Sequence, residues 1–282
     1  MKTIKLNDKM NRFFMFLLAG LLFAACSEDV ITENALDATD LVVSETDMEA
    51  VYEDIDGLSM VSMDAVNESS TGGKTEDTID DDRFCSGVFS FAGTREAGTI
   101  TLDFGDGCID AKGNLRKGKI VITFIGKHVE VGSVITMTFV NYSINGIAIE
   151  GTRTTTNISN EPDSVLTFNV TLEDGKITWE DGTFATREAD HVRVWDRSNG
   201  KVYVSGTAEG VTRRGVAYSS LITEDLVFDK TCRRSRRGRK PVAGVKVITT
   251  ENKEISIYYG DGECDSKVRV VVNGTEEELE VD

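Results

Sequence analysis

The clearest chemistry in this sequence lies in four cysteines that fall into two matched pairs. In each pair the second cysteine closely follows a strand-like segment and a Gly-Asp-Gly sequence, and the first cysteine stands before that segment. The pairs are Cys85 with Cys108 and Cys232 with Cys264. In an oxidising compartment such cysteines form disulfides, and of the three connectivities that four cysteines allow, the repeated pattern favours these two. A zinc site is the alternative, but the chain has no Cys-x-x-Cys spacing.

The matched cysteines belong to an internal repeat that spans residues 85–125 and 232–273. Acidic residues near the second cysteine of each copy could bring carboxylates around a calcium ion. Turn chemistry explains the same residues without an ion, because Asp-Gly closes turns and aspartate accepts nearby backbone N–H groups. We therefore predict turns here, with no metal and no cofactor. The carboxylates concerned are Asp106, Asp110, Asp261 and Asp265.

Three polar and aromatic side chains alternate along another strand-like segment. His191, Arg193 and Trp195 are two residues apart, so they share one face of the predicted strand. An indole with polar groups beside it can stack against a sugar, which makes this face a candidate ligand-binding site for a glycan. The favoured interpretation is a strand face that neighbouring elements partly cover.

A short basic loop interrupts an otherwise acidic chain. Strand-like segments flank it, so we expect a loop tip. It is a candidate site for an anionic polysaccharide, a lipopolysaccharide phosphate or the acidic tether of a neighbouring molecule, although a solvated loop is favoured. Its bases are Arg233, Arg234, Arg236, Arg237, Arg239 and Lys240.

Familiar catalytic motifs do not occur in the sequence. It has no Gly-x-Ser-x-Gly and no His-Glu-x-x-His, and disulfide pairing leaves no nucleophilic cysteine in the body. Paired carboxylates could make a glycosidase, but with so many acids their spacing selects no pair. We predict a non-enzymatic protein, with a carbohydrate-active hydrolase or a glycan-binding accessory lipoprotein as the alternative.

Alternating side chains predict strands from Phe84 to the C-terminus. Residues 135–139, 166–172 and 268–272 alternate apolar and polar types, which indicates strands with one buried face. Asn-Gly and Asp-Gly pairs between such segments are typical of two-residue hairpins. Residues 84–282 are therefore predicted to form an all-β, antiparallel domain. A β-sandwich is the first choice of architecture, and an extended meander sheet is the second.

The segment 26–83 that precedes this domain is an acidic tether. Residues 27–80 carry 16 acids and a single base, whereas residues 81–282 carry 31 acids and 26 bases. Apolar residues at spacings of three, four and seven predict a helix over about 45–66, at least transiently docked. An acidic tether is repelled by anionic lipid head groups, and the scarcity of bases argues against a nucleic-acid partner.

The N-terminus has the features of an export signal. Four bases precede an apolar stretch that ends in small residues, so residues 1–25 are predicted to be a signal peptide, too short to span a membrane as a mature helix. The sequence Ala24-Ala25-Cys26 resembles a bacterial lipobox. This resemblance implies that Cys26 is lipidated and becomes the first mature residue, which makes the membrane a partner through the lipid.

The whole chain resembles uncharacterised outer-membrane lipoproteins of the Bacteroidota. The likeness rests on the lipobox, the acidic helical leader, the paired Gly-Asp-Gly-Cys segments and Ser27-Glu28-Asp29, which is similar to an acidic export tag. It implies a β body anchored by lipid in the outer membrane at the cell surface, and it brings no assigned activity.

These features together predict a surface-exposed, lipid-anchored envelope protein with a binding or structural role. A fimbrial subunit that polymerises by strand exchange is a further alternative. The acidic, helix-prone leader argues against it, because strand exchange requires an N-terminal strand.

Overall fold

The computed structural model describes residues 28–68, 79, 81–85, 88–160, 165–232, 240–265 and 267–280. One helix, α1 (Glu28–Glu68), precedes fourteen strands. The strands are β1 (Phe89–Gly93), β2 (Ala97–Asp103), β3 (Cys108–Ile109), β4 (Leu115–Ile125), β5 (Val134–Ile144), β6 (Ile147–Asn157), β7 (Val165–Thr178), β8 (Phe184–Asp196), β9 (Lys201–Val211), β10 (Ala217–Asp229), β11 (Ala243–Thr250), β12 (Glu254–Asp261), β13 (Lys267–Val272) and β14 (Thr275–Glu280).

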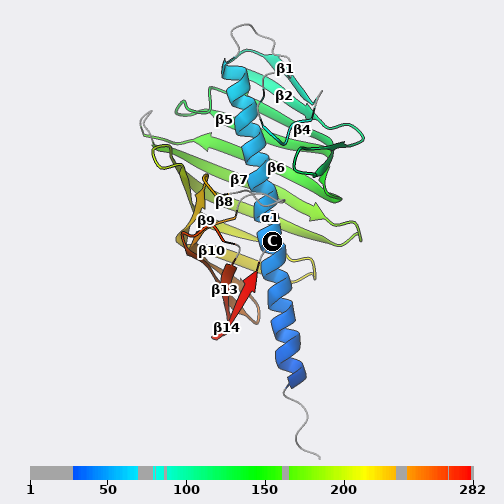
Figure 1. Cartoon of the computed structure of the whole chain (residues 1–282), viewed down its shortest axis with the longest axis vertical. Helices are drawn as coiled ribbons and strands as arrows, with labels where there is room; N and C mark the ends of the chain where they lie inside the picture. The colour runs from blue at the N-terminus through cyan, green and yellow to red at the C-terminus, as the bar shows by residue number, and fades with distance from the viewer. Residues whose placement is uncertain are drawn as a thin grey trace, which may run out of the picture. The chain divides into compact units, whose positions relative to one another are not determined.

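All of these strands belong to one antiparallel sheet, which confirms the predicted all-β class. From β4 onward every strand pairs with the next strand in the chain, while β2 pairs with β4 and the short β3 pairs with β4 beside that path. Of the two architectures that the sequence suggested, the hydrogen-bonded order is that of the extended meander. Figure 1 shows the strands following one another from β1 to β14.

Local bulges interrupt the pairing between most neighbouring strands from β4 to β12. Glycines with positive φ stand at several of them, among them Gly151 at +122° and Gly206 at +126°. A Cβ on Gly206 would lie 2.2 Å from the carbonyl oxygen of Asp190, so no larger residue fits there. Bulges bend strands and increase their twist. The strands are therefore expected to bend at these positions.

Helix α1 contributes to the core of the compact unit Asp40–Asp282. From Asp40 onward the helix runs across the strands on one face of the sheet (Figure 1). The predicted helix over 45–66 lies within it, but the helix begins earlier, because no glycine or proline occurs between Glu28 and Gly57. The body likewise begins before residue 84. The apolar residues that predicted the helix are all buried, namely Leu41, Met48, Val51, Tyr52, Ile55 and Leu58.

Both predicted disulfides are confirmed. Cys85 bonds to Cys108 across 23 residues of sequence, with their Cα atoms 6.3 Å apart. Cys232 bonds to Cys264 across 32 residues, with a Cα separation of 5.4 Å. Each bond joins the segment before a pair of strands to a residue just after that pair, where Cys108 begins the short β3 and Cys264 follows β12. The internal repeat is therefore repeated in structure as well.

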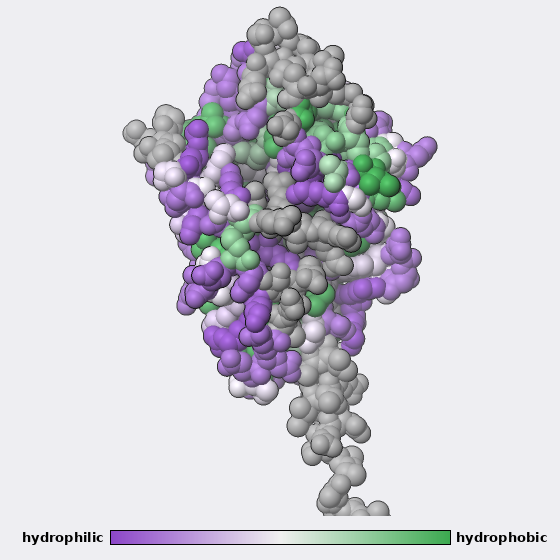
Figure 2. All heavy atoms as spheres, in the orientation of Figure 1, coloured by the Kyte–Doolittle hydropathy of each residue, from purple (hydrophilic) through white to green (hydrophobic). Residues whose placement is uncertain are grey.

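The described surface is mostly polar. Figure 2 shows hydrophilic residues over much of the face drawn, with hydrophobic residues in separated groups. The most exposed large apolar side chains are Ile109 and Ile125. Among the described residues, no helix is both long enough and apolar enough to cross a membrane.

Candidate functional site

Helix α1 is held on the sheet by a set of ion pairs that we call the helix clamp. Four of its carboxylates, at positions 45, 49, 53 and 56, are three or four residues apart along the helix, so they lie close together on its surface, and Asp54 directly follows the third of them. The bases that meet them come from β4, β6, β8 and β11 and from the segment before β1. The clamp consists of Glu45, Glu49, Glu53, Asp54 and Asp56 on α1, paired with Arg83, Arg116, Arg153, Arg187, Arg193 and Lys246.

The first part of the clamp centres on Glu45, whose side chain is almost fully buried. Arg187 of β8 donates a hydrogen bond to it, and the hydroxyl of Tyr218 donates another at 3.0 Å. Lys246 of β11 lies 3.5 Å from Glu45 and also bonds to Glu49. Burial alone would raise the pKa of Glu45, but Arg187 and Lys246 outweigh burial and bring the pKa down to about 2. Glu45 is therefore ionised at any physiological pH.

The middle of the clamp is a two-bond contact between Asp56 and Arg153 of β6. The Nε and Nη2 atoms of Arg153 lie 2.6 Å and 2.7 Å from the two carboxylate oxygens. Arg193 of β8 donates to Glu53 at 2.6 Å and to Asp56 at 3.2 Å. Burial would raise the pKa of Asp56, but the two arginines hold it below its usual range. The two carboxylates of the helix and the two guanidinium groups of the sheet therefore have no net charge together.

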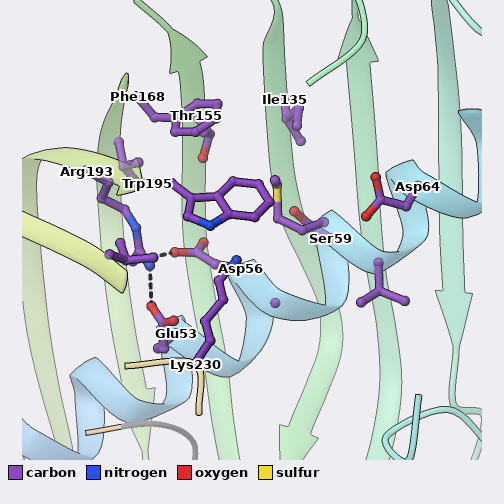
Figure 3. Close-up of a pocket in the computed structure, with 15 residues that line it drawn as sticks. Glu53, Asp56, Ser59, Asp64, Ile135, Thr155, Phe168, Arg193, Trp195 and Lys230 are labelled. Atoms are coloured by element: carbon purple, nitrogen blue, oxygen red, sulfur yellow. Dashed lines mark hydrogen bonds and ion pairs between the residues drawn. The ribbon is translucent and has the colours of Figure 1, made fainter. Parts of the chain in front are cut away.

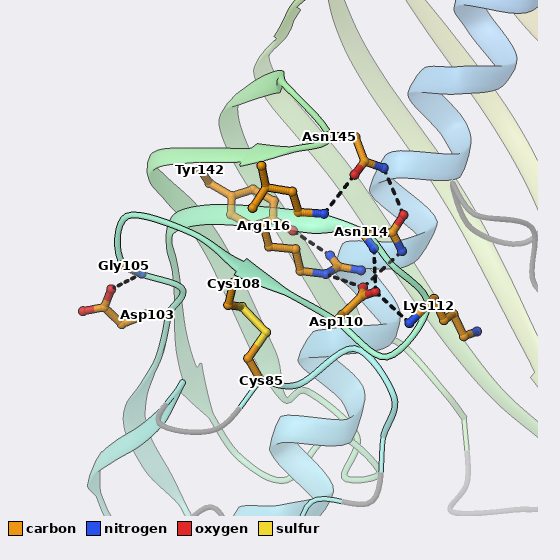
Figure 4. Close-up of a disulfide and its surroundings, with 11 residues drawn as sticks. Cys85, Asp103, Gly105, Cys108, Asp110, Lys112, Asn114, Arg116, Tyr142 and Asn145 are labelled. Atoms are coloured by element: carbon orange, nitrogen blue, oxygen red, sulfur yellow. Dashed lines mark hydrogen bonds and ion pairs between the residues drawn. A yellow bond between two sulfur atoms is a disulfide. The ribbon is translucent and has the colours of Figure 1, made fainter.

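A third part of the clamp connects the helix to the first disulfide loop. Asp54 accepts hydrogen bonds from Arg83 at 3.3 Å and from Arg116 at 2.7 Å. Arg116 also donates to Asp110 at 3.1 Å and to the Tyr142 hydroxyl at 2.8 Å, as Figure 4 shows. Burial raises the pKa of Tyr142 to about 12, so its hydroxyl stays protonated. The loop next to Cys108 is thus fixed to α1 through one guanidinium group.

Asp110 acts as the centre of a turn. Its carboxylate accepts backbone N–H groups of Lys112 at 3.0 Å and Asn114 at 2.8 Å, in addition to the Arg116 bond (Figure 4). In the second copy of the repeat, Asp265 accepts the N–H of Lys267 at 3.2 Å. Within the described ranges, no group of three or more His, Cys, Asp or Glu side chains is placed to hold a metal ion.

Charges buried in this way position the helix rather than simply adding stability. Removing two charges from water costs several kcal/mol per ion, so a complete buried pair contributes little net free energy. Breaking such a pair leaves an uncompensated charge and costs about 3–5 kcal/mol. The clamp therefore penalises every arrangement of α1 that leaves any of its carboxylates unmatched.

Helix α1 packs against β8, so the three residues of the predicted ligand face do not share one open surface. His191 lies beside the clamp residues Arg187 and Arg193, and burial together with those charges holds its pKa well below its usual value. Arg193 is engaged by the helix carboxylates. Of the three predicted residues, Arg193 and Trp195 line the larger cavity described below, whereas His191 lines a smaller one together with Arg193. The smaller cavity is also lined by Glu49 and Tyr52, so the element that faces His191 is the protein's own helix.

The cavity has a volume of about 350 Å³ and lies between α1 and strands β5 to β9. Figure 3 shows the indole of Trp195 between the helix and the strands, with Glu53 and Asp56 directed at Arg193. The ammonium group of Lys230 lies 3.4 Å from the centre of the indole ring. Because Arg193 holds both carboxylates, neither is placed as a free acid or base for glycoside hydrolysis.

Several predicted sites lie outside the described residues. These are the signal peptide of residues 1–25, the lipidation site Cys26, and the basic loop from Arg233 to Arg239. Lys240, the last base of that loop, is described and is partly buried.

The bases of the clamp were not predicted from the sequence. Arg116, Arg153 and Arg187 each occupy an inward-facing strand position; Arg187, for example, stands between the buried Ala185 and the partly buried Ala189. A base at such an inward position needs a buried counter-charge. The segment of residues 27–80 has 16 acids and a single base, so it was the natural source of these counter-charges. The pairing of the inward bases with the acidic helix could therefore have been inferred from the sequence.

The chain was compared with protein-family models, with curated proteins and with solved structures, and none of the three comparisons found a match.

Proposed function

We propose that this protein is a lipid-anchored, non-enzymatic protein of the outer membrane, exposed at the cell surface, with a binding role in its β body. The lipid is carried by Cys26, and the body extends outward from the segment that follows it. The observation that carries the proposal is the helix clamp, taken together with the lipobox resemblance in the sequence.

The clamp supports an anchoring role for the segment after Cys26. From Asp40 onward, α1 belongs to the body and cannot leave it without exposing matched buried charges. A lipid on Cys26 would precede α1, and the part of this helix from Asp40 onward is fixed in the core of the protein. Two or more acyl chains hold a protein on a membrane with negligible release.

The groups in the cavity support a binding role in preference to catalysis. Glu53 and Asp56 are neutralised by Arg193, and His191 lies beneath the helix. A general acid or base must be within reach of its substrate with a suitable pKa. Trp195 and the apolar wall around it remain available as a contact surface.

Lipidation is tested by labelling cells with an alkyne analogue of palmitate and isolating the protein. We expect the chain with native Cys26 to carry the label and Cys26→Ser to lose it. Ser27→Ala, a change next to the same site, is the matched control and should keep the label. An unlabelled native chain would contradict the anchor.

Exposure is tested by treating intact cells with protease and probing for residues 84–282 of the body next to a periplasmic marker. We expect loss of the body while the marker survives. If Ser27-Glu28-Asp29 acts as an export tag, Glu28→Gln with Asp29→Asn should leave the lipid in place and protect the body. Protection of the native body until the cells are lysed would contradict the surface location.

A further inference from the structure

The cavity beside Trp195 has the composition of a site for an apolar ligand. Phe168 and Val170 of β7 form, with Leu166, an apolar cluster against which Trp195 packs, and this cluster is separate from the main core. Met60 of the helix faces the same space. Binding pockets are mainly apolar, with a few polar groups that fix orientation, and about 300–1,000 Å³ in volume. The cavity's 350 Å³ falls in this range.

The helix is built to leave this space open. Gly57 is the first glycine of α1 and lines the cavity, at a position where any other residue would bring a side chain. Glycine in a helix interior lowers the stability of the helix relative to alanine, so Gly57 makes α1 less stable than it could be. A ligand that occupies the cavity would explain why a glycine stands at this position.

The charged groups that line the cavity already have partners in the protein. Glu53 and Asp56 are bonded to Arg193. Lys230 lies over the ring of Trp195, and Asp64 is 3.4 Å from His128. A charged ligand would have to compete with these contacts and would lose its own hydration on entry. The hydroxyls of Ser59 and Thr155 line the same cavity and carry no charge.

We propose that the cavity binds a neutral, predominantly apolar molecule, a hydrocarbon chain or ring that carries at most a hydroxyl group. This inference names the ligand of the binding role proposed above and rests on that role. An apolar cavity of about 150 Å³ binds benzene, so a cavity of about 350 Å³ accommodates a considerably longer hydrocarbon. Ser59 and Thr155 are placed to meet its hydroxyl end.

The test uses Trp195 as its own reporter. Trp179→Phe leaves Trp195 as the only tryptophan in the chain. We would use the mature chain with Cys26→Ser, so that neither lipid nor detergent competes, and titrate it with decanol, decanoate, decyltrimethylammonium and maltotriose. We expect decanol to shift the emission to shorter wavelength in a saturable way. The two charged analogues should bind at least about tenfold more weakly.

A variant that fills the space separates occupancy of the cavity from general surface binding. Gly57→Leu places a side chain in the cavity and raises helix propensity, so it should abolish the decanol response while the melting temperature is kept or raised. Gly57→Ala is the matched control and should keep most of the response. Displacement of a neutral fluorescent naphthylamine from the chain with both tryptophans gives a second measurement that does not depend on Trp179→Phe.

The outcomes distinguish the ligand class from the binding role. A saturable response to maltotriose or to a charged analogue, with none to decanol, overturns the neutral apolar class and leaves the binding role intact. Equal decanol responses in Gly57→Leu and the parent chain overturn the assignment to this cavity. Absence of any response by both methods overturns the ligand class and the binding role together.

Discussion

Arg153 of β6 and Asp56 of α1, 97 residues apart in the sequence, form a two-bond ion pair in the interior of the protein. We predict that Arg153→Met lowers the free energy of unfolding by about 3–5 kcal/mol, because it leaves part of the charge of Asp56 uncompensated. Urea denaturation measures the change. Combining Arg153→Met with Asp56→Asn should recover part of the loss, which a double-mutant cycle detects as coupling.

The matched control for this pair is on the surface. Arg269 and Glu276 also form an ion pair, at 3.6 Å, but both side chains are exposed. Arg269→Met should change stability by less than about 1 kcal/mol, because solvent-exposed pairs contribute little. Equal losses in Arg153→Met and Arg269→Met would contradict the distinction between a buried clamp and surface pairing.

Protonation of Glu45 at low pH should lower the free energy of unfolding. The folded-state pKa of about 2 lies below the value of about 4.3 for a glutamate in an unfolded chain. A lowered pKa contributes stability that is present above the unfolded value and is lost as pH falls through the folded value. We predict a decline in the free energy of unfolding between about pH 5 and pH 2, measured by denaturation at a series of pH values.

Glu45→Gln provides the comparison for this pH effect. The variant should be less stable at neutral pH, because Arg187 loses its charged partner, and its stability should fall less steeply between pH 5 and pH 2. The same slope in both proteins would show that Glu45 does not carry the effect.

The second disulfide should stabilise the fold. Cys232 and Cys264 are 32 residues apart, and a loop of this size corresponds to a stabilisation of roughly 3 kcal/mol in the chain-entropy model. We predict that replacing both cysteines by alanine lowers the free energy of unfolding by about that amount. Mass spectrometry after alkylation, with and without reduction, should show the pair oxidised in the native protein. Alkylation of either cysteine without reduction would contradict the bond.

The bend in the sheet should depend on its glycines. We predict that Gly206→Val prevents normal folding, because φ is +126° and a Cβ would meet the Asp190 carbonyl oxygen at 2.2 Å. Soluble yield and near-ultraviolet circular dichroism report the loss. Gly113→Asn is the control, since φ there is +84°, no atom lies within 4 Å of a Cβ, and asparagine tolerates this conformation. Normal folding of Gly206→Val would show that the bend does not require this glycine.

Local patterns predicted much of the fold. Alternation and Asn-Gly or Asp-Gly pairs predicted an antiparallel domain, and the repeated cysteines predicted both disulfides, because each of these signals acts between residues close in the sequence. The length of α1 was underestimated, since apolar spacing marks only the part of a helix that packs. The absence of glycine and proline before Gly57 was the better guide to where it begins.

The helix clamp was not predicted because its partners are far apart in the sequence. The acidic leader was predicted to dock through its apolar residues, and the β8 residues were interpreted as a partly covered strand face, with a glycan-binding face as the alternative. Each interpretation was reasonable for its own segment. Only the packing of α1 on the sheet shows that Arg193 and the helix carboxylates satisfy one another.

The meander has a consequence for the order in which the protein assembles. Each strand from β4 to β14 pairs with the one made just before it, so the sheet can grow as the chain emerges. Helix α1 is made first, yet Glu45 meets Lys246, which is 201 residues further along the chain. Complete seating of the helix therefore waits until β11 has joined the sheet. Lys246 is the last base of the clamp to be made, so the contacts of Glu45 and Glu49 with it are the last of the clamp to form.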